Sequence, residues 1–386
     1  SFDALDSVGK VREAEVPNHL RDANRDSEGF GHGEGYLYPH AYRDHWVAQQ
    51  YLPDALQGKL FYQPSDQGYE MGIAFEVARK REAQLAAMLE GDSAGAPEVL
   101  TGGPADRNRD RWLERTSGQA GERLGELRDR VFELARVQRH HLVLDVNAAT
   151  GLLTWEAVRR TPEGQVWAQV RSGEQGAALE GQARSLPDLE RPVVVTGAIA
   201  DAAQRAHAEG VRFDVLLGRN ALVDAEDRAA ALAQLSGLLT DSGGSLVLAE
   251  AYPLATQRLY DLPRSPGVSD ELLERWKRAE DHIYETSTAA RFSWTPDSAH
   301  ALLEAAGLKR PKVTQFETSV RRRLNPALLD SWFPEGPDER ADSYASRLAE
   351  SLSEEDLAVI ERSLRRLANA SVEWRTVNLL LEAKTG

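Results

Sequence analysis

The chain has 386 residues and a net charge of −15, with the length of two domains and a composition (41% apolar, 28% charged) typical of globular rather than fibrous or disordered proteins. Because it contains no cysteine, disulfides, thiolate zinc sites and cysteine nucleophiles are excluded, and a reducing cytoplasm is the expected location. The acidic balance disfavours non-specific DNA binding, and no apolar run is long enough to span a membrane, so no membrane contact is expected.

The first segment, residues 1–90, is predicted to be helical. It opens with a polar stretch that lacks an initiator Met and a signal peptide, so we interpret the chain as a fragment or a processed product. Four glycines between Gly29 and Gly35 interrupt the helical pattern. A second helix is predicted over residues 70–89, because Ile73, Val77 and Leu85 lie roughly along one face.

Aromatic residues are concentrated in residues 31–69. They can fill a small core or anchor an oligomer interface, and composition leaves both interpretations open. The candidate interface residues are Tyr36, Tyr38, Trp46, Tyr51, Phe61 and Tyr62. The nearby His32, His40 and His45 lack the spacing of a helical zinc pair, so no metal site is predicted.

Four short motifs in this segment resemble those of one protein family. VPNHLRD at residues 16–22 is followed by GEGYLYPH, HWVAQQYLPD and FYQPSDQGYE, and together they resemble the C-terminal part of AAA+ ATPases of the RarA/MgsA type. The resemblance implies a truncated all-helical oligomerisation segment that forms a homotetramer. It also implies an AAA+ domain upstream in the same polypeptide, and DNA and replication proteins as partners of the full-length protein.

The ATPase motor itself is not expected in this chain. No G-x-x-x-x-G-K-[ST] loop occurs, so nothing here can hold ATP phosphates in the P-loop manner. Any ATP would therefore bind in the upstream domain.

Residues 91–108 are rich in Gly, Ala, Pro and Asp, which is typical of a linker. From residue 109 to 386, strand and helix patterns alternate. A helix is predicted over 112–141, strands over 142–144, 166–170, 193–196, 213–217 and 245–249, and later helices around 272–283, from Pro296 and over 353–367. Such alternation predicts a parallel sheet covered by helices on both faces. The basic cluster Arg321–Arg323 is interpreted as an exposed loop or strand end, with a phosphate contact as the alternative.

Several words of this second segment resemble class I methyltransferases that use S-adenosylmethionine (SAM). They are FDVLLGRNALV at 213–223, LLTDSGGSLVLAE at 238–250 and VEWRTVNLLLEAK at 372–384. The resemblance implies a Rossmann-like domain with a mainly parallel seven-stranded sheet and an antiparallel last strand. The chain as a whole is therefore predicted to be α/β, with a small all-α segment in front.

The cofactor loop of that family reads acid-x-Gly-x-Gly-x-Gly. Here the corresponding positions are Asp145, Asn147, Ala149 and Gly151, so the acid and the last glycine remain. Asn tolerates a left-handed backbone, whereas the Ala149 methyl group would enter cofactor space. With Asn220 of the fourth motif, these residues form the candidate SAM crevice, and SAM is the one cofactor that the resemblance suggests.

Two other acids that the family implies are missing. One is expected at the end of the second strand, near Val170 or Arg171, and one after the third strand, where Asp201 lies too far along. The fourth motif lacks the [DN]-P-P-[YFW] of amino-group DNA methyltransferases, and methylation at cytosine C5 needs a cysteine. Base methylation of DNA is thus not expected. His207, His282 and Glu250 are conceivable bases for other substrates, although such residues are more often structural.

Three functions remain open from the sequence. The favoured one is a C-terminal assembly and docking module of a replication- and recombination-associated AAA+ ATPase, whose methyltransferase-like domain is degenerate. The alternative is an active SAM-dependent methyltransferase with an unknown substrate other than a DNA base, for which the catalytic residues are unknown. The third is binding of another nucleotide or metabolite in the same crevice.

Overall fold

The computed structural model describes residues 62, 64, 67–90, 120–184, 186–263, 267–287, 289–324, 326–334 and 343–386. They divide into two compact units, one containing α2 and the other everything from Glu126 onward. Helix α2 (Gly68–Glu90) confirms the helix predicted over residues 70–89. The predicted linker at 91–108 and nearly all of the segment before it lie outside the described residues. Within the described part, none of the helices is both long enough and apolar enough to cross a bilayer.

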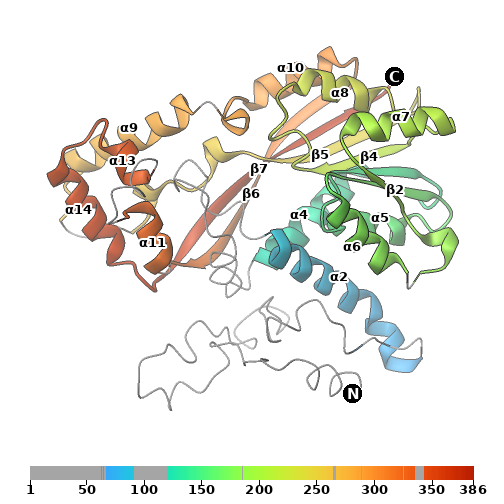
Figure 1. Ribbon diagram of the computed structural model, residues 1–386, viewed down its shortest axis with the longest axis horizontal. Coiled ribbons are helices and arrows are strands. Elements are labelled where there is room, and N and C mark those ends of the chain that lie inside the picture. The colour runs from blue at the N-terminus through green and yellow to red at the C-terminus, as the bar shows by residue number, and fades with distance from the viewer. Residues whose placement is uncertain are drawn as a thin grey trace. The chain divides into compact units, whose positions relative to one another are not determined.

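One seven-stranded sheet organises the second unit (Figure 1). Its order is β3-β2-β1-β4-β5-β7-β6, and β1 to β5 are parallel while β7 is antiparallel to both of its neighbours. The strands are β1 (Leu142–Val146), β2 (Gln165–Val170), β3 (Val193–Thr196), β4 (Val215–Arg219), β5 (Ser245–Ala251), β6 (Lys309–Arg323) and β7 (Ser371–Lys384). The predicted mainly parallel sheet with an antiparallel last strand is therefore confirmed.

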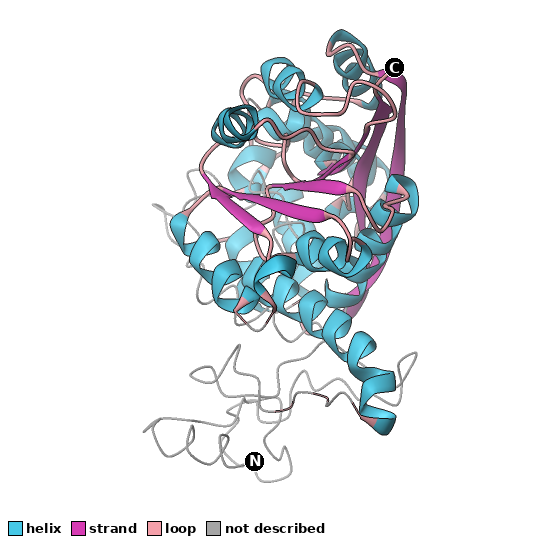
Figure 2. Ribbon diagram, turned by 90° about the vertical axis from the view of Figure 1, so that its right-hand side faces the viewer, coloured by secondary structure: helices cyan, strands magenta, loops and turns pink. Residues whose placement is uncertain are grey.

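Helices cover both faces of this sheet (Figure 2), which is why its central strands are nearly continuous apolar runs. The core on one face joins α4 (Ala120–Ala135) and α5 (Leu152–Arg160), with α6 (Gly173–Ala183) beside α5. The core on the other face joins α7 (Ile199–Glu209), α8 (Arg228–Ser236) and α10 (Pro296–Ala305).

Two predicted boundaries were wrong. The helix expected to reach His141 ends at Ala135, because Arg136 adopts a left-handed φ of 49°. The strand expected over 213–217 runs from Val215 to Arg219, since Phe213 only forms an isolated bridge to Leu239. Asn220 is consequently the first residue after β4.

A second apolar core extends the domain beyond the parallel strands. Strands β6 and β7 stay paired from Lys309↔Lys384 out to Arg323↔Ser371, whereas β5 pairs with β7 only as far as Ala251↔Asn378. The projecting ribbon carries a lobe of helices, shown with α9 and α14 at the left of Figure 1. These helices are α9 (Asp270–Thr286), α11 (Pro326–Trp332), α13 (Tyr344–Leu348) and α14 (Glu354–Arg365).

The sequence predicted parts of this lobe. Trp276 and Ile283 of α9 are buried as expected, and Ser353 caps α14 by accepting a hydrogen bond from the Asp356 N–H. The cluster Arg321–Arg323 does end a strand, but Arg322 is 4% exposed with its guanidinium 4.6 Å from the Trp374 ring centroid. The interpretation of an exposed cluster is therefore wrong for Arg322, because strand alternation turns it inward.

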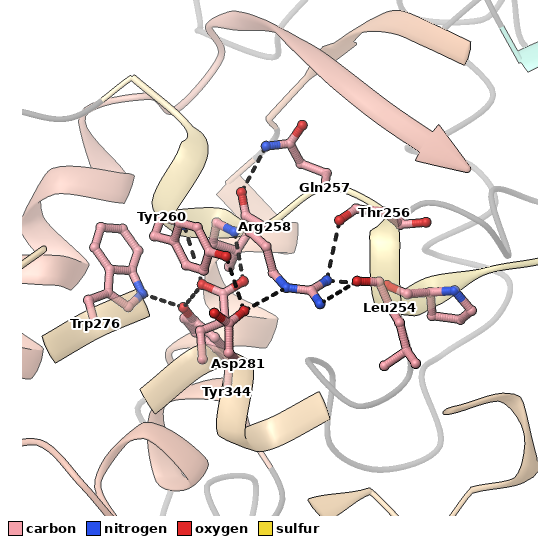
Figure 3. Close-up of polar contacts among 11 residues, drawn as sticks. Leu254, Thr256, Gln257, Arg258, Tyr260, Trp276, Asp281 and Tyr344 are labelled. Atoms are coloured by element: carbon pink, nitrogen blue, oxygen red, sulfur yellow. Dashed lines mark hydrogen bonds and ion pairs between the residues drawn. The ribbon is translucent and has the colours of Figure 1, made fainter. Parts of the chain in front are cut away.

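A buried carboxyl group joins three segments of the lobe (Figure 3). Glu280 of α9 is fully buried and accepts hydrogen bonds from the Leu259 N–H (2.8 Å) and the Tyr344 hydroxyl (2.7 Å). Trp276 donates its indole N–H to the same hydroxyl. Burial raises the pKa of Glu280 to about 7.

Arg258 fixes the chain that leads into this lobe. Its guanidinium donates to the carbonyl of Leu254 at 2.8 Å and pairs with Asp281 at 3.2 Å, as Figure 3 shows. It also lies 3.6 Å from the ring centroid of Tyr284. A buried Arg with this many partners fixes the backbone conformation of the chain between β5 and α9.

Removing the Tyr344 hydroxyl should destabilise the lobe. Tyr344→Phe leaves the Trp276 N–H without its acceptor and removes one of the donors to Glu280, at a cost of about 1–3 kcal/mol in the free energy of unfolding. The matched control is Tyr260→Phe, because that hydroxyl donates to Asp281, a carboxylate that water can reach (45% exposed). Chemical denaturation measures both variants, and equal losses of stability would contradict this account of the network.

Candidate functional site

The candidate crevice lies at the carboxyl edge of the parallel strands. In open α/β sheets, ligands bind at this edge where the strand order reverses, which here is between β1 and β4. Three chain segments meet there: the β1–α5 loop, the residues after β2 and the turn after β4. The structure brings the five predicted crevice residues into two of these segments.

The β1–α5 loop keeps a left-handed backbone at all three positions where the methyltransferase motif has glycine. The φ angles are 60° at Asn147, 47° at Ala149 and 82° at Gly151. For Ala149 this conformation costs roughly 1–2 kcal/mol, whereas Asn adopts it readily. Gly151 is required, because a Cβ there would lie 2.4 Å from Nε1 of Trp155. The loop therefore has a left-handed backbone at Asn147 and Ala149, although neither residue is glycine.

Asn147 connects this loop to the end of β4. Its side-chain Nδ2 donates to the carbonyl oxygens of Arg219 and Asn220, both at 2.9 Å. Its backbone N–H donates to the side chain of Gln169 at 2.8 Å, and Gln169 donates in turn to the carbonyl of Gly197. The loop is thus hydrogen-bonded to Gln169 in β2 and to the end of β4, and Gln169 connects it to the segment after β3.

Arg171 occupies the place where an acid was expected after β2. Its side chain is exposed, and Nη2 donates to the carbonyls of Asn220 (3.0 Å) and Ala221 (3.3 Å). The Asn220 carbonyl therefore accepts from both Asn147 and Arg171. A guanidinium consequently bridges the ends of β2 and β4.

The turn after β4 is also tied to β5. Asn220, with φ of 51°, accepts a hydrogen bond from the Ala251 N–H on its side-chain oxygen at 2.9 Å. Glu250 is fully buried and accepts from the N–H groups of Ala221 (2.9 Å) and Leu222 (3.1 Å). Burial raises the pKa of Glu250 to about 7. Of the three conceivable bases, Glu250 holds this turn, while His207 and His282 are exposed on α7 and α9.

Asp145 lies at the end of β1 with one oxygen unsatisfied. It is 1% exposed, and Oδ2 accepts from the Thr154 hydroxyl at 2.6 Å, but Oδ1 has no hydrogen-bond partner among the described residues. Burial raises the pKa of this carboxyl group to about 7. Asp201, which lies too far along the chain to be the acid expected after β3, has a structural role. It accepts a hydrogen bond from the Ala198 N–H and caps α7.

Gln169 and the bridging role of Arg171 were not predicted from the sequence. A Gln in the otherwise buried strand VWAQV was a usable signal, since buried polar side chains require partners. The contacts across the strand ends could not be derived, because they depend on the strand order.

Among the candidate interface residues, only Tyr62 is described. Its side chain is 44% exposed, and its hydroxyl donates to Glu70 at 3.2 Å. The guanidinium of Arg81 lies 5.8 Å from its ring centroid. Tyr36, Tyr38, Trp46, Tyr51 and Phe61 lie outside the described residues, so the interface remains a prediction.

Replacing Asp145 with Asn should change how stability depends on pH. The pKa of Asp145 is raised from 3.8 to about 7, so its contribution is complete below pH 4 and is lost as the pH rises to 7 and above. A shift of this size corresponds to at most about 4 kcal/mol. Relative to the natural chain, Asp145→Asn should therefore gain stability between pH 4 and 8.

Denaturant unfolding at a series of pH values measures this difference. Thr154→Val is the matched variant: it removes the hydroxyl bond that lowers the pKa of Asp145 and should extend the loss of stability to higher pH. Parallel stability curves for the natural chain and Asp145→Asn would show that this carboxyl group does not titrate as described.

The strand order and the helices on both faces of the sheet define an α/β protein with a Rossmann-like domain. Residues 1–81 of the same chain match the family described as MgsA AAA+ ATPase C terminal. Replication-associated recombination protein A of Bacillus subtilis (strain 168) is 42% identical over 80 residues, which cover 20% of this chain and 18% of that protein. An uncharacterised AAA domain-containing protein of Mycobacterium tuberculosis is 37% identical over 79 residues, with the same two coverages. The chain thus spans less than a fifth of the length of these relatives.

Solved structures with a similar arrangement were also found. The YcgJ protein from Bacillus subtilis matches 68% of this chain and 98% of its own, at 14% identity and a TM-score of 0.40. Precorrin-6y C5,15-methyltransferase from Geobacter metallireducens GS-15 matches 67% of this chain and 87% of its own, at 12% identity and a TM-score of 0.35. Likeness of this degree says nothing about ligand or activity.

Proposed function

We propose that this chain is the C-terminal assembly and docking module of a cytoplasmic AAA+ ATPase that acts in DNA replication and recombination. The match of residues 1–81 to the MgsA C-terminal family and the 42% identity to a replication-associated recombination protein support this assignment. ATP hydrolysis and contacts with DNA and replication proteins belong to the whole protein in this proposal, because the matched region is a small part of its relatives.

The second part of the proposal is that the Rossmann-like domain does not transfer methyl groups. The observation that carries it is Arg171 at the end of β2, hydrogen-bonded to the turn after β4. The ribose hydroxyls of SAM need acceptors at this place, and a guanidinium can only donate. An acid offers the acceptors that Arg171 lacks.

The β1–α5 loop supports the same conclusion. Asn147 directs its amide to the carbonyls of Arg219 and Asn220, where the methyltransferase motif has no side chain. Ala149 adds a methyl group at the second glycine position. Both substitutions put atoms where the family motif leaves room for the backbone to approach its cofactor. The residues present therefore do not fit SAM.

Calorimetric titration with SAM and S-adenosylhomocysteine tests this part. We expect no binding heat at millimolar ligand for the natural chain. Arg171→Asp, which restores an acid after β2, and Arg171→Ala, which removes the charge without adding an acid, form a matched pair; any gain in binding should appear only with Asp. Micromolar binding by the natural chain that is lost in Asp145→Ala would overturn the non-catalytic assignment.

An active SAM-dependent methyltransferase is the second candidate. Two observations favour it: the left-handed backbone is kept at Asn147, Ala149 and Gly151, and Oδ1 of the buried Asp145 lacks a partner in the described part of the chain. Both features suit a loop that still receives a ligand. Its substrate would not be a DNA base, for the reasons given from the sequence.

The assembly role predicts a homotetramer. Light scattering on the whole chain at micromolar concentration should give four times the chain mass. Trp46→Ala should lower that mass, because loss of a large aromatic anchor weakens an interface, whereas Trp46→Phe keeps most of the buried area. A monomeric natural chain would contradict the proposed assembly.

A further inference from the structure

We propose that the crevice beside β2 binds a nucleotide that carries a phosphate monoester on its ribose. This inference rests on the proposed function, since it concerns what the crevice takes once SAM is not its ligand. It starts from the residue that replaces the missing acid. In dinucleotide-binding Rossmann domains, an acid in this region binds ribose hydroxyls, whereas a nearby Arg accommodates a 2′-phosphate.

The end of β2 has the chemistry for a phosphate. Val170, the last strand residue, is buried and apolar, and Glu250 is a carboxyl group that interacts electrostatically with Arg171. The next two residues are Arg171 and Ser172. A guanidinium and a hydroxyl can both donate hydrogen bonds to phosphate oxygens.

The guanidinium is available for exchange. Arg171 is exposed, and Nη2 of its side chain donates to two neutral carbonyls, at 3.0 and 3.3 Å. Its Nε and Nη1 make no hydrogen bond with the described residues. Charge-assisted bonds to a phosphate are shorter and stronger than bonds to carbonyls, so an incoming phosphate would displace them.

Helix α6 adds backbone donors at the same place. It has 11 residues and begins directly after Ser172, whose hydroxyl accepts from the Gln175 N–H at 3.3 Å. A Cβ added at Gly173 would meet nothing within 4 Å, so the space beside the first turn is open. Phosphates bind at helix N-termini through such N–H groups. Glu174 in this turn is exposed and opposes an anion.

Asp145 provides an independent indication of a ligand. Strand β1 lies beside β2, with Asp145 paired to Ala168, and its buried Oδ1 lacks a partner among the residues described. A buried carboxyl oxygen without a partner is costly, and a hydroxyl or amino group of a nucleotide would satisfy it. In this proposal, Arg171 binds the phosphate and Oδ1 of Asp145 accepts a hydrogen bond from the nucleoside.

The loop after β1 limits the ligand to a mononucleotide. Backbone approach to a pyrophosphate depends on the glycines that Asn147 and Ala149 replace. We therefore assign the phosphate subsite to Arg171 and α6, and no pyrophosphate subsite to the loop.

Calorimetric titration of the whole chain at low ionic strength, with adenosine 2′-monophosphate and adenosine, tests the inference. We expect the monophosphate to bind roughly tenfold or more tightly than adenosine. Arg171→Ala should remove this difference, and Glu174→Gln should enlarge it. Arg184→Ala is the matched control, because Arg184 is exposed at the other end of α6 and should leave the preference unchanged.

Equal affinities for the two ligands, no binding of either, or an unchanged preference in Arg171→Ala would overturn the inference. Inorganic phosphate distinguishes a nucleotide site from a simple anion site. It should compete only weakly with adenosine 2′-monophosphate, and competition as strong as that of the nucleotide itself would refute a nucleotide site. A parallel titration with S-adenosylhomocysteine distinguishes failure of the non-catalytic assignment from failure of the nucleotide site. Binding of S-adenosylhomocysteine would overturn the non-catalytic assignment, whereas failure of adenosine 2′-monophosphate alone would overturn only this inference.

Discussion

The turn after β4 is the constraint on which the crevice depends. Its backbone groups are hydrogen-bonded by Asn147 after β1, Arg171 after β2 and Glu250 in β5, and the side chain of Asn220 accepts from the Ala251 N–H. The bonds from Glu250 satisfy the buried N–H groups of Ala221 and Leu222, each of which would cost about 1–3 kcal/mol without a partner. The protein therefore closes its own strand ends with side chains, and a ligand must compete with them.

The lobe lies beyond the same edge of the sheet. Strand β5 stops opposite Asn378, so the first residues of β7 and their partners in β6 project past the carboxyl ends of the parallel strands. Gln257 holds the chain between β5 and α9 on this projection, because its side chain accepts from the Arg375 N–H, and the buried bonds of Glu280 and Arg258 fix the rest of that chain. Both polar networks thus shape the side of the domain where a Rossmann-like fold receives its ligands.

The order of elements could be predicted from sequence because buried parallel strands are short apolar runs, and β3 was located to the residue. Helix ends were less predictable: α4 stops at a left-handed Arg136, a residue type that gives no such signal. The polar bridges escaped prediction for another reason. Arg171 and Asn220 are 49 positions apart, and their contact follows from β1 lying between β2 and β4. The missing acid was visible in the sequence, but the role of its replacement was not.

The most direct test of the central claim, that side chains of the chain itself take the place of SAM, is a crystal structure determined after soaking with millimolar S-adenosylhomocysteine. The account predicts clear density for the Arg171 guanidinium on the carbonyls of Asn220 and Ala221, with Asn147 bonded to the end of β4 and no nucleoside in the crevice. Ordered S-adenosylhomocysteine at the end of β1, with Arg171 turned away from the β4 turn, would contradict it.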